Sequence, residues 1–69
     1  MKLSARNQLA GTVREVRKGA TTSHVRVEIG GGQVVTASIT NEAVDELGLA
    51  EGKPATVIVK ASDVMVAVE

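Results

Sequence analysis

The stretch HVRVEIGGGQVVTASIT, residues 24–40, decides the fold because it predicts a β-hairpin. Apolar and polar residues alternate over residues 24–29, which is the period-two pattern of a strand that buries one face. The glycine-rich residues 30–33 predict a tight hairpin loop, and residues 34–40 predict the returning strand. We therefore expect the domain to be built on antiparallel β-sheet.

The flanking sequence extends this hairpin into a mostly β domain. Residues 9–17 predict an earlier strand, in which Gly11 marks a bend or bulge. Residues 41–48 (NEAVDELG) predict a two-turn helix that a Thr or Asn caps and a glycine ends. Residues 55–60 and 64–68 predict two final strands. Three strands, a short helix and two strands is the element order of the OB-fold, a small five-stranded barrel.

The composition limits how stable such a barrel can be alone. The chain has 69 residues, with no cysteine and no aromatic residue, so we expect residues 1–69 to form one domain with an aliphatic core. A chain this short buries only about 60% of the surface that its unfolded form exposes. Because disulfides and thiolate metal sites are excluded, we expect oligomerisation to supply stability. Neither a membrane-spanning stretch nor a secretory signal is evident, which predicts a cytoplasmic protein.

The net charge of zero conceals an uneven distribution. Residues 1–26 contain six basic residues but only one acidic residue, Glu15. A basic half indicates either affinity for anions or a solvated strand face, and charge alone does not separate the two.

Three groups of polar residues are candidate binding sites. Ser4 and Arg6 lie two positions apart before the first strand, where an extended backbone would direct both to one side. Residues 60–62, KAS, offer a lysine, a hydroxyl and backbone amides after an apolar run, and residues 36–40 place a row of hydroxyls on one strand face. Each group also has a structural interpretation, as a surface arginine, a solvated strand end or cross-strand hydroxyl pairs.

The three groups share hydrogen-bond donors, which indicates an anion as the ligand. Guanidinium and ammonium groups are charge-assisted donors, and hydroxyls and amides complete the shell around a tetrahedral oxyanion. Catalysis is not indicated, because His24 has no evident orienting partner or nucleophile. Nucleic-acid binding is a minor alternative, since OB barrels stack bases on aromatic side chains, which this chain lacks.

The motifs SARNQLAGTV, VTASIT, ELGLAEGK and VIVKASDVMVAV occur in this order. In them, from Leu3 to Val68, the chain resembles the molbindins, small cytoplasmic molybdate-binding proteins with a TOBE-type domain that are also called Mop or molybdenum-pterin-binding proteins. The resemblance implies an OB-like barrel assembled as a hexamer, a trimer of dimers with strand exchange. It implies storage or buffering of molybdate or tungstate for molybdenum homeostasis, without enzymatic activity, a catalytic cofactor, or a nucleic-acid or membrane partner.

The resemblance also implies which residues bind the oxyanion, in a pocket between subunits. Arg6 and Lys60, from different subunits, would supply charge, while hydroxyl donors and backbone amides would come from Ser4, Thr40, Ala61 and Ser62. A second class of site near the threefold axis would involve the RKGATTS segment, with Lys18, Gly19 and Thr21 as candidates.

The family's domain also occurs fused to molybdate-responsive regulators and to transporter ATPases. This chain contains no helix-turn-helix or Walker sequence, so we expect the free-standing form. The alternative function is a molybdate-sensing interaction domain that acts with a molybdate transporter or regulator.

Overall fold

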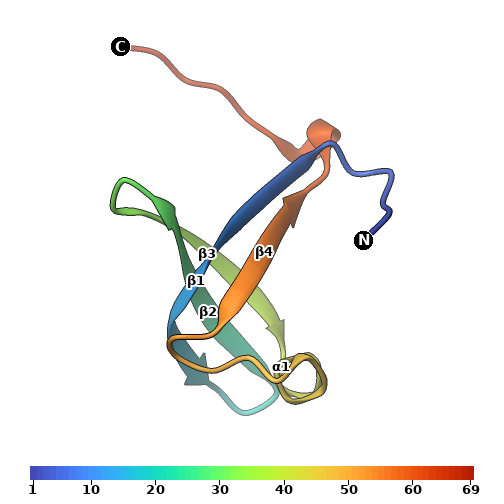
Figure 1. Ribbon diagram of the computed structural model, residues 1–69, viewed down its shortest axis with the longest axis vertical. Helices are drawn as coiled ribbons and strands as arrows, with labels where there is room; N and C mark the ends of the chain where they lie inside the picture. Colours follow the sequence, from blue (N-terminus) through green and yellow to red (C-terminus); the bar gives the residue numbers. More distant parts are fainter.

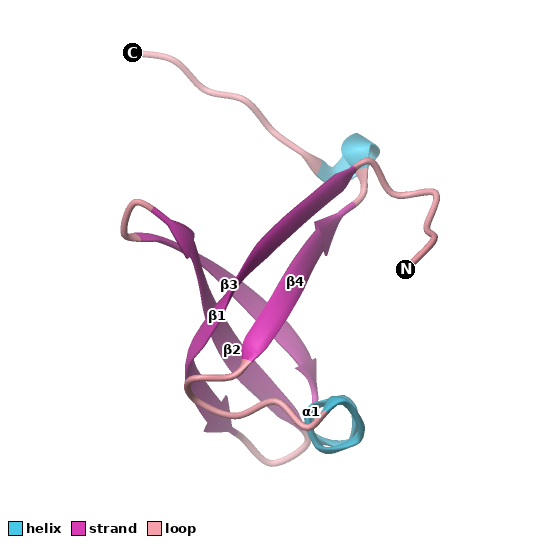
Figure 2. Cartoon of the chain, viewed as in Figure 1, coloured by secondary structure: helices cyan, strands magenta, loops and turns pink.

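A computed structural model describes all 69 residues as a four-stranded antiparallel sheet with one short α-helix (Figure 1). The elements are β1 (Asn7–Lys18), β2 (Thr22–Gly30), β3 (Gln33–Thr40), α1 (Asn41–Leu47), β4 (Pro54–Val59) and the 3₁₀ helix η1 (Ala61–Asp63). The strand order is β3-β2-β1-β4, and the sheet does not close on itself (Figure 2). Four predicted strands and the predicted helix are confirmed, with ends within two residues of those expected. No helix is long and apolar enough to cross a membrane.

The predicted hairpin forms around a glycine turn. β2 and β3 pair from Thr22 opposite Thr40 to Gly30 opposite Gln33. Gly31 and Gly32 at the turn have φ angles of 58° and 78°, a left-handed conformation that glycine adopts without steric cost. The period-two pattern therefore orients the hairpin as the sequence predicts, with alternate residues of β2 buried.

β1 is long enough to pair with two different strands. Its first half pairs with β4, from Asn7 opposite Val59, and its second half pairs with β2, as far as Lys18. Gly11 lies where β1 approaches β2 most closely, because a Cβ there would collide with the Glu28 carbonyl oxygen. The bulge that we expected at Gly11 lies instead between Val13 and Glu15. β1 thus carries the chain from one half of the sheet to the other.

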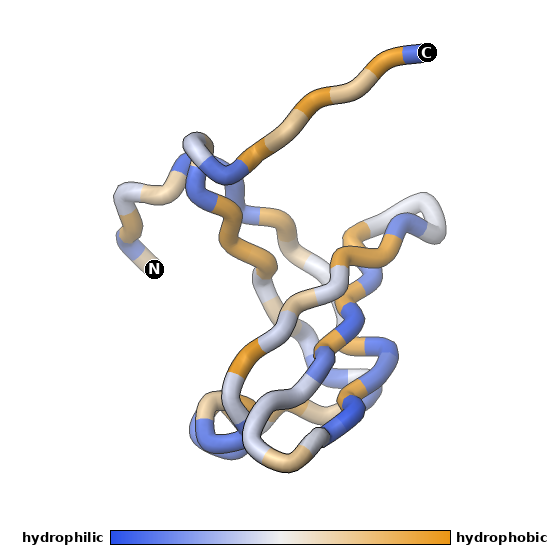
Figure 3. Tube along the Cα trace, turned by 180° about the vertical axis from the view of Figure 1, so that it is seen from behind, coloured by the Kyte–Doolittle hydropathy of each residue, from blue (hydrophilic) through white to orange (hydrophobic).

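The prediction of a fifth strand at residues 64–68 is wrong for the single chain. These residues follow η1 as an extended tail with no strand pairing, which leads away from the sheet (Figures 1 and 3). Met65 and Val68 are each 93% exposed, and Val66 is 88% exposed. The β-type sequence is present, but a strand needs a partner for its backbone hydrogen bonds, and none lies beside this segment.

The hydrophobic core is small and consists of valine. Val13, Val25, Val27 and Val44 are buried, and half-buried aliphatic side chains from β1 to β4 pack around them. Only 5 of the 69 residues are buried, while ten large apolar side chains are exposed. A core this small leaves much apolar surface exposed on the single chain, and the expected oligomerisation stays a prediction.

The fifth buried residue is polar and anchors α1 to the sheet. The hydroxyl of Ser23 donates to the side-chain oxygen of Asn41, whose amide nitrogen donates in turn to the Gly19 carbonyl at 3.0 Å. Thr40 is the N-cap, with its Oγ1 accepting from the Ala43 amide at 3.1 Å. These bonds join the β1–β2 turn to the first turn of the helix.

We expect Asn41→Ala to lower the free energy of unfolding by about 1–3 kcal/mol, because the Ser23 hydroxyl would remain buried without its acceptor. Ser38→Ala is the matched control, since Ser38 is an exposed hydroxyl on β3. Denaturant unfolding followed by circular dichroism at one fixed protein concentration measures both. Equal midpoints for the two variants would show that the buried bond contributes nothing.

Candidate functional site

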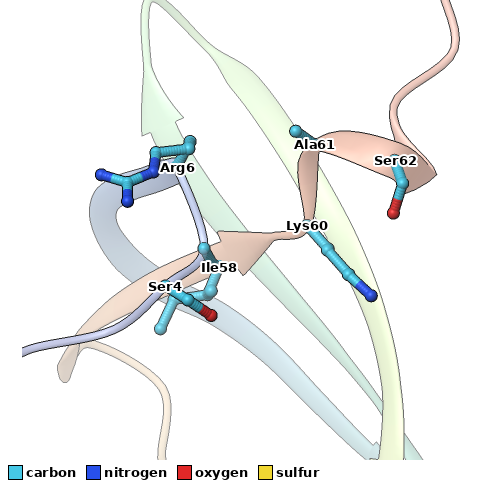
Figure 4. Close-up of a pocket in the computed structure, with 7 residues that line it drawn as sticks. Ser4, Arg6, Ile58, Lys60, Ala61 and Ser62 are labelled. Atoms are coloured by element: carbon cyan, nitrogen blue, oxygen red, sulfur yellow. The ribbon is translucent and has the colours of Figure 1, made fainter.

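The pairing of β1 with β4 brings the two ends of the chain together. Asn7 lies opposite Val59, so the residues that precede β1 lie beside those that follow β4. Between them is an open hollow of about 540 Å³ (Figure 4), whose lining residues are Ser4, Ala5, Arg6, Ile58, Lys60, Ala61 and Ser62. Five of the six predicted main-site residues therefore meet within one chain, whereas we expected Arg6 and Lys60 to come from different subunits.

The remaining two residues of the SARNQ segment shape this hollow. The Asn7 side chain donates to the Val59 carbonyl oxygen at 3.0 Å, which ties the start of β1 to the end of β4. Gln8 donates to the Ala5 carbonyl oxygen at 3.2 Å and so folds back on the preceding bend. Asn7 and Gln8 thus hold the backbone, and the side chains of Ser4 and Arg6 stay free to contact a ligand.

The local backbone differs from the extended form that we expected at both ends. Residues 4–6 form a bend rather than a strand, and Figure 4 shows the side chains of Ser4 and Arg6 directed away from each other. Ser62 lies in η1 rather than on a strand face shared with Lys60. In Figure 4 the Arg6 and Lys60 side chains also extend in opposite directions. In the single chain, the donors therefore line one hollow, but their side chains do not point to a common position (Figure 4).

Arg6 and Lys60 belong to the half of the eight basic residues that form no ion pair, together with Lys2 and Lys53. Four of the six basic residues within residues 1–26 lie within 4.0 Å of a carboxylate, in the pairs Arg14–Glu28, Arg17–Glu15, Lys18–Asp45 and Arg26–Glu15. Arg6 and Lys60 form no ion pair in the structure. The basic half is therefore a neutralised strand face over β1 and β2, and uncompensated positive charge remains at the hollow.

The turn after Lys60 leaves backbone donors at the same place. The hydrogen bonds of η1 run from the Asp63 amide to the Lys60 carbonyl at 2.9 Å and from the Val64 amide to the Ala61 carbonyl at 3.2 Å. Ala61 and Ser62 are the first two residues of η1, and the amides at the N-terminus of a helix have no acceptor within the helix. They can therefore donate to a bound group.

Thr40 does not lie at this hollow. It precedes α1, which lies at the opposite end of the molecule from η1 (Figure 1). Its Oγ1 already accepts the capping bond from Ala43, but a hydroxyl has one proton and two lone pairs, so the proton remains available. A ligand that contacts both Thr40 and Arg6 would have to lie between two copies of the chain.

The predicted second site coincides in part with a smaller polar hollow. This hollow has a volume of about 280 Å³ and is lined by Arg17, Lys18, Gly19, Thr22 and His24. Of the three predicted residues, Thr21 is absent from the lining, and Lys18 is engaged with Asp45 at 2.8 Å. The sequence analysis missed Arg17 and His24, although the pairing of the two strands places them opposite each other.

An apolar groove lies next to the main hollow. It has a volume of about 560 Å³, and ten of its twelve lining residues are hydrophobic. The lining comes from β2, β3 and β4, together with Met1, the end of α1 and the α1–β4 connection. Val25, Ile39 and Val57 are among them. Ile58 lines both the groove and the main hollow, and the sequence analysis missed it because it sought donors only.

Comparison with known proteins places this geometry in a family. The TOBE domain family matches residues 3–66. The "Molybdenum transport protein ModE" of Herbaspirillum seropedicae is 54% identical over 97% of this chain, which corresponds to 25% of the length of that protein. A solved structure of the cytoplasmic molybdate-binding protein ModG, with molybdate bound, has a TM-score of 0.91 and 45% identity, and covers 94% of this chain and 46% of its own.

The most extensive of these matches covers both sequences entirely. The "Probable molybdenum-pterin-binding protein" of Haemophilus influenzae is 48% identical over 100% of this chain and 100% of its own length. This chain therefore belongs to the TOBE domain family and, within it, to the molybdenum-pterin-binding proteins.

Proposed function

We propose that this protein binds molybdate, and tungstate with it, as a stoichiometric oxyanion store in the cytoplasm that buffers molybdenum for the cell. The main support is that two cations without ion-pair partners, Arg6 and Lys60, line the same hollow as free hydroxyl and amide donors. The similarity of this chain to ModG, whose structure contains bound molybdate, supports molybdate as the oxyanion. No step of a reaction is assigned to it, because the donor set lacks a nucleophile paired with a base.

The proposed roles follow from the chemistry of each donor. Arg6 and Lys60 supply positive charge, and each unit-charge pair about 4 Å apart gains on the order of 4 kcal/mol at an effective dielectric near 20, before desolvation. Ser4 donates a hydroxyl proton, and Ala61 and Ser62 donate backbone amides, as a tetrahedral dianion requires. Molybdate and tungstate are dianions of nearly equal size, so the same donors suit both.

We propose that Thr40 completes this site from a second subunit. Its position at the end of the molecule opposite η1 (Figure 1) supports an interface site, since one copy alone cannot direct Thr40 and Arg6 at the same ion. The divergent directions of Arg6 and Lys60 support the same view. The proposed assembly is a hexamer, a trimer of dimers, with the second sites at the hollow that contains Lys18 and Gly19, beside Thr21.

The C-terminal tail is the proposed means of dimer formation. Residues 64–68 carry a β-type sequence with exposed apolar side chains, and both outer strands of the sheet, β3 and β4, have an unpaired edge. The apolar groove offers these side chains a place to be buried. Exchange of the tail between subunits would supply the fifth strand and close each sheet into the five-stranded OB-like barrel.

A sensing role is the second candidate. The match to one quarter of ModE supports it, because this domain also forms part of larger transport-related proteins. A protein partner recovered in stoichiometric amounts only in the presence of molybdate would favour sensing over storage.

We expect Arg6→Ala and Lys60→Ala each to weaken molybdate binding by about ten- to a hundredfold, the range for a charge-assisted hydrogen bond. Lys53→Ala is the control, since Lys53 is an unpaired lysine away from the hollow. Isothermal titration with molybdate, tungstate and sulfate measures the affinities. Absence of molybdate binding by the unaltered oligomer would overturn the proposed function.

We expect Thr40→Asp to weaken molybdate binding while it preserves α1, because an ionised aspartate is a good N-cap that accepts hydrogen bonds but donates none. Thr40→Ser keeps both roles and serves as the control. Mixed oligomers refolded from Arg6→Ala and Thr40→Asp chains should regain some tight sites, since each can supply what the other lacks. No recovery in the mixture, despite confirmed subunit exchange, would contradict a site shared between subunits.

We expect Val66→Lys to dissociate the oligomer, because the tail would carry a charge into an apolar groove. If the tail stayed in solvent, a lysine at this exposed position would change stability by less than about 0.5 kcal/mol. Ala50→Lys, at an exposed loop position, is the control. Light scattering after size-exclusion chromatography gives the mass, and an unchanged mass for Val66→Lys would refute tail exchange.

A further inference from the structure

We infer that Ile58 is a specificity-determining residue of the oxyanion site, and that it favours molybdate over the smaller sulfate ion by forming an apolar wall. This inference rests on the proposed function of the same site. It concerns a residue that is neither a donor nor a charge, and it addresses which tetrahedral dianion is held rather than whether one is held.

The position of Ile58 in β4 is unusual for a large aliphatic side chain. Residues along β4 alternate in burial, and Ile58 lies on the more exposed face, with 41% of its surface accessible, between Thr56 and Lys60. Two positions along a strand share one face, so Ile58 and Lys60 lie on the same side of β4. Ile58 and Ser4 both line the main hollow (Figure 4). It therefore lies among the proposed donors.

Ile58 is the only large apolar side chain that lines the hollow, because the other two hydrophobic residues there are Ala5 and Ala61. It cannot donate a hydrogen bond, so its contribution is contact and exclusion of water. Removing water strengthens the charge-assisted bonds that remain. An ion large enough to reach the Ile58 side chain gains that contact, whereas a smaller ion held by the same donors leaves a gap.

The Ile58 side chain can select ions by size only if it is held in a fixed position. The other side of Ile58 faces the apolar groove, which it lines together with Ile39 and Val57. Once the groove is filled, as tail exchange would require, close packing behind Ile58 prevents the side chain from moving away. Through Ile58, packing between subunits would then determine the size of the oxyanion site.

The test is the ratio of sulfate to molybdate dissociation constants, measured by titration calorimetry on the assembled oligomer. We expect Ile58→Val to lower this ratio by on the order of tenfold, the lower end of what one methylene group contributes to discrimination. Weaker molybdate binding should account for the change, and sulfate binding should stay constant. Ile39→Val removes the same methylene group from the groove without touching the hollow, and it should leave the ratio unchanged.

The outcomes separate this inference from the proposed function. Failure of the unaltered protein to bind molybdate overturns the function itself. Normal molybdate binding with an unchanged ratio in Ile58→Val, or with equal changes in both valine variants, overturns the role of Ile58 alone. If Ile58→Val does not assemble, Ile58→Met decides, because a longer side chain should crowd the larger ion more than sulfate and again lower the ratio.

Discussion

The pairing of the two ends of the chain through β1 and β4 is the constraint on which the rest of the structure depends. Asn7 opposite Val59 brings residues from both termini to one place, and the Asn7 side chain adds a bond to the Val59 carbonyl oxygen at 3.0 Å. β1 pairs first with β4 and then with β2, and Gly11 permits a close approach to the Glu28 carbonyl where β1 changes partners. A binding site that combines residues before β1 with residues after β4 depends on this β1–β4 pairing.

The same topology leaves much apolar surface of the single chain uncovered. A sheet of four strands with an aliphatic sequence buries only four valines, and its two outer strands keep unpaired edges. Larger aromatic residues would have filled the space between strands, but this chain has none. In the proposed assembly, the exposed tail, the apolar groove and the distant Thr40 would all be used by a second copy. Folding, assembly and ligand binding would then be linked, because a ligand bound only by the assembly stabilises it.

Local sequence patterns predicted most of the fold. Alternation over residues 24–29, the glycine loop and the capped helix each depend on neighbours in the sequence, and each is confirmed. The fifth strand was wrong for the single chain because pairing depends on a partner, which a β-type sequence does not supply. The bulge was misplaced because a glycine serves either a bend or a close approach, and only the packing against Glu28 distinguishes them.

The site was predictable in its chemistry but less so in its arrangement. Arg6 and Lys60 were identified from their donors, whereas their presence in one hollow follows from the β1–β4 register, which no local pattern specifies. Ile58 was missed because an apolar residue in a strand normally indicates core. The ligand-binding roles of the residues at the main hollow, of Thr40 and of the second site all remain predictions.

The exposed C-terminal tail also has a consequence for the newly made chain. Residues 64–68 combine high β propensity with no charge, and they pair with no strand. Such a segment is accessible to proteases and to strand pairing with unrelated chains until it is covered. In the proposed tail exchange, covering it by a second copy would be a bimolecular step, so its rate per chain would rise with the concentration of the protein. A cell that makes little of this protein would therefore leave each copy vulnerable for longer.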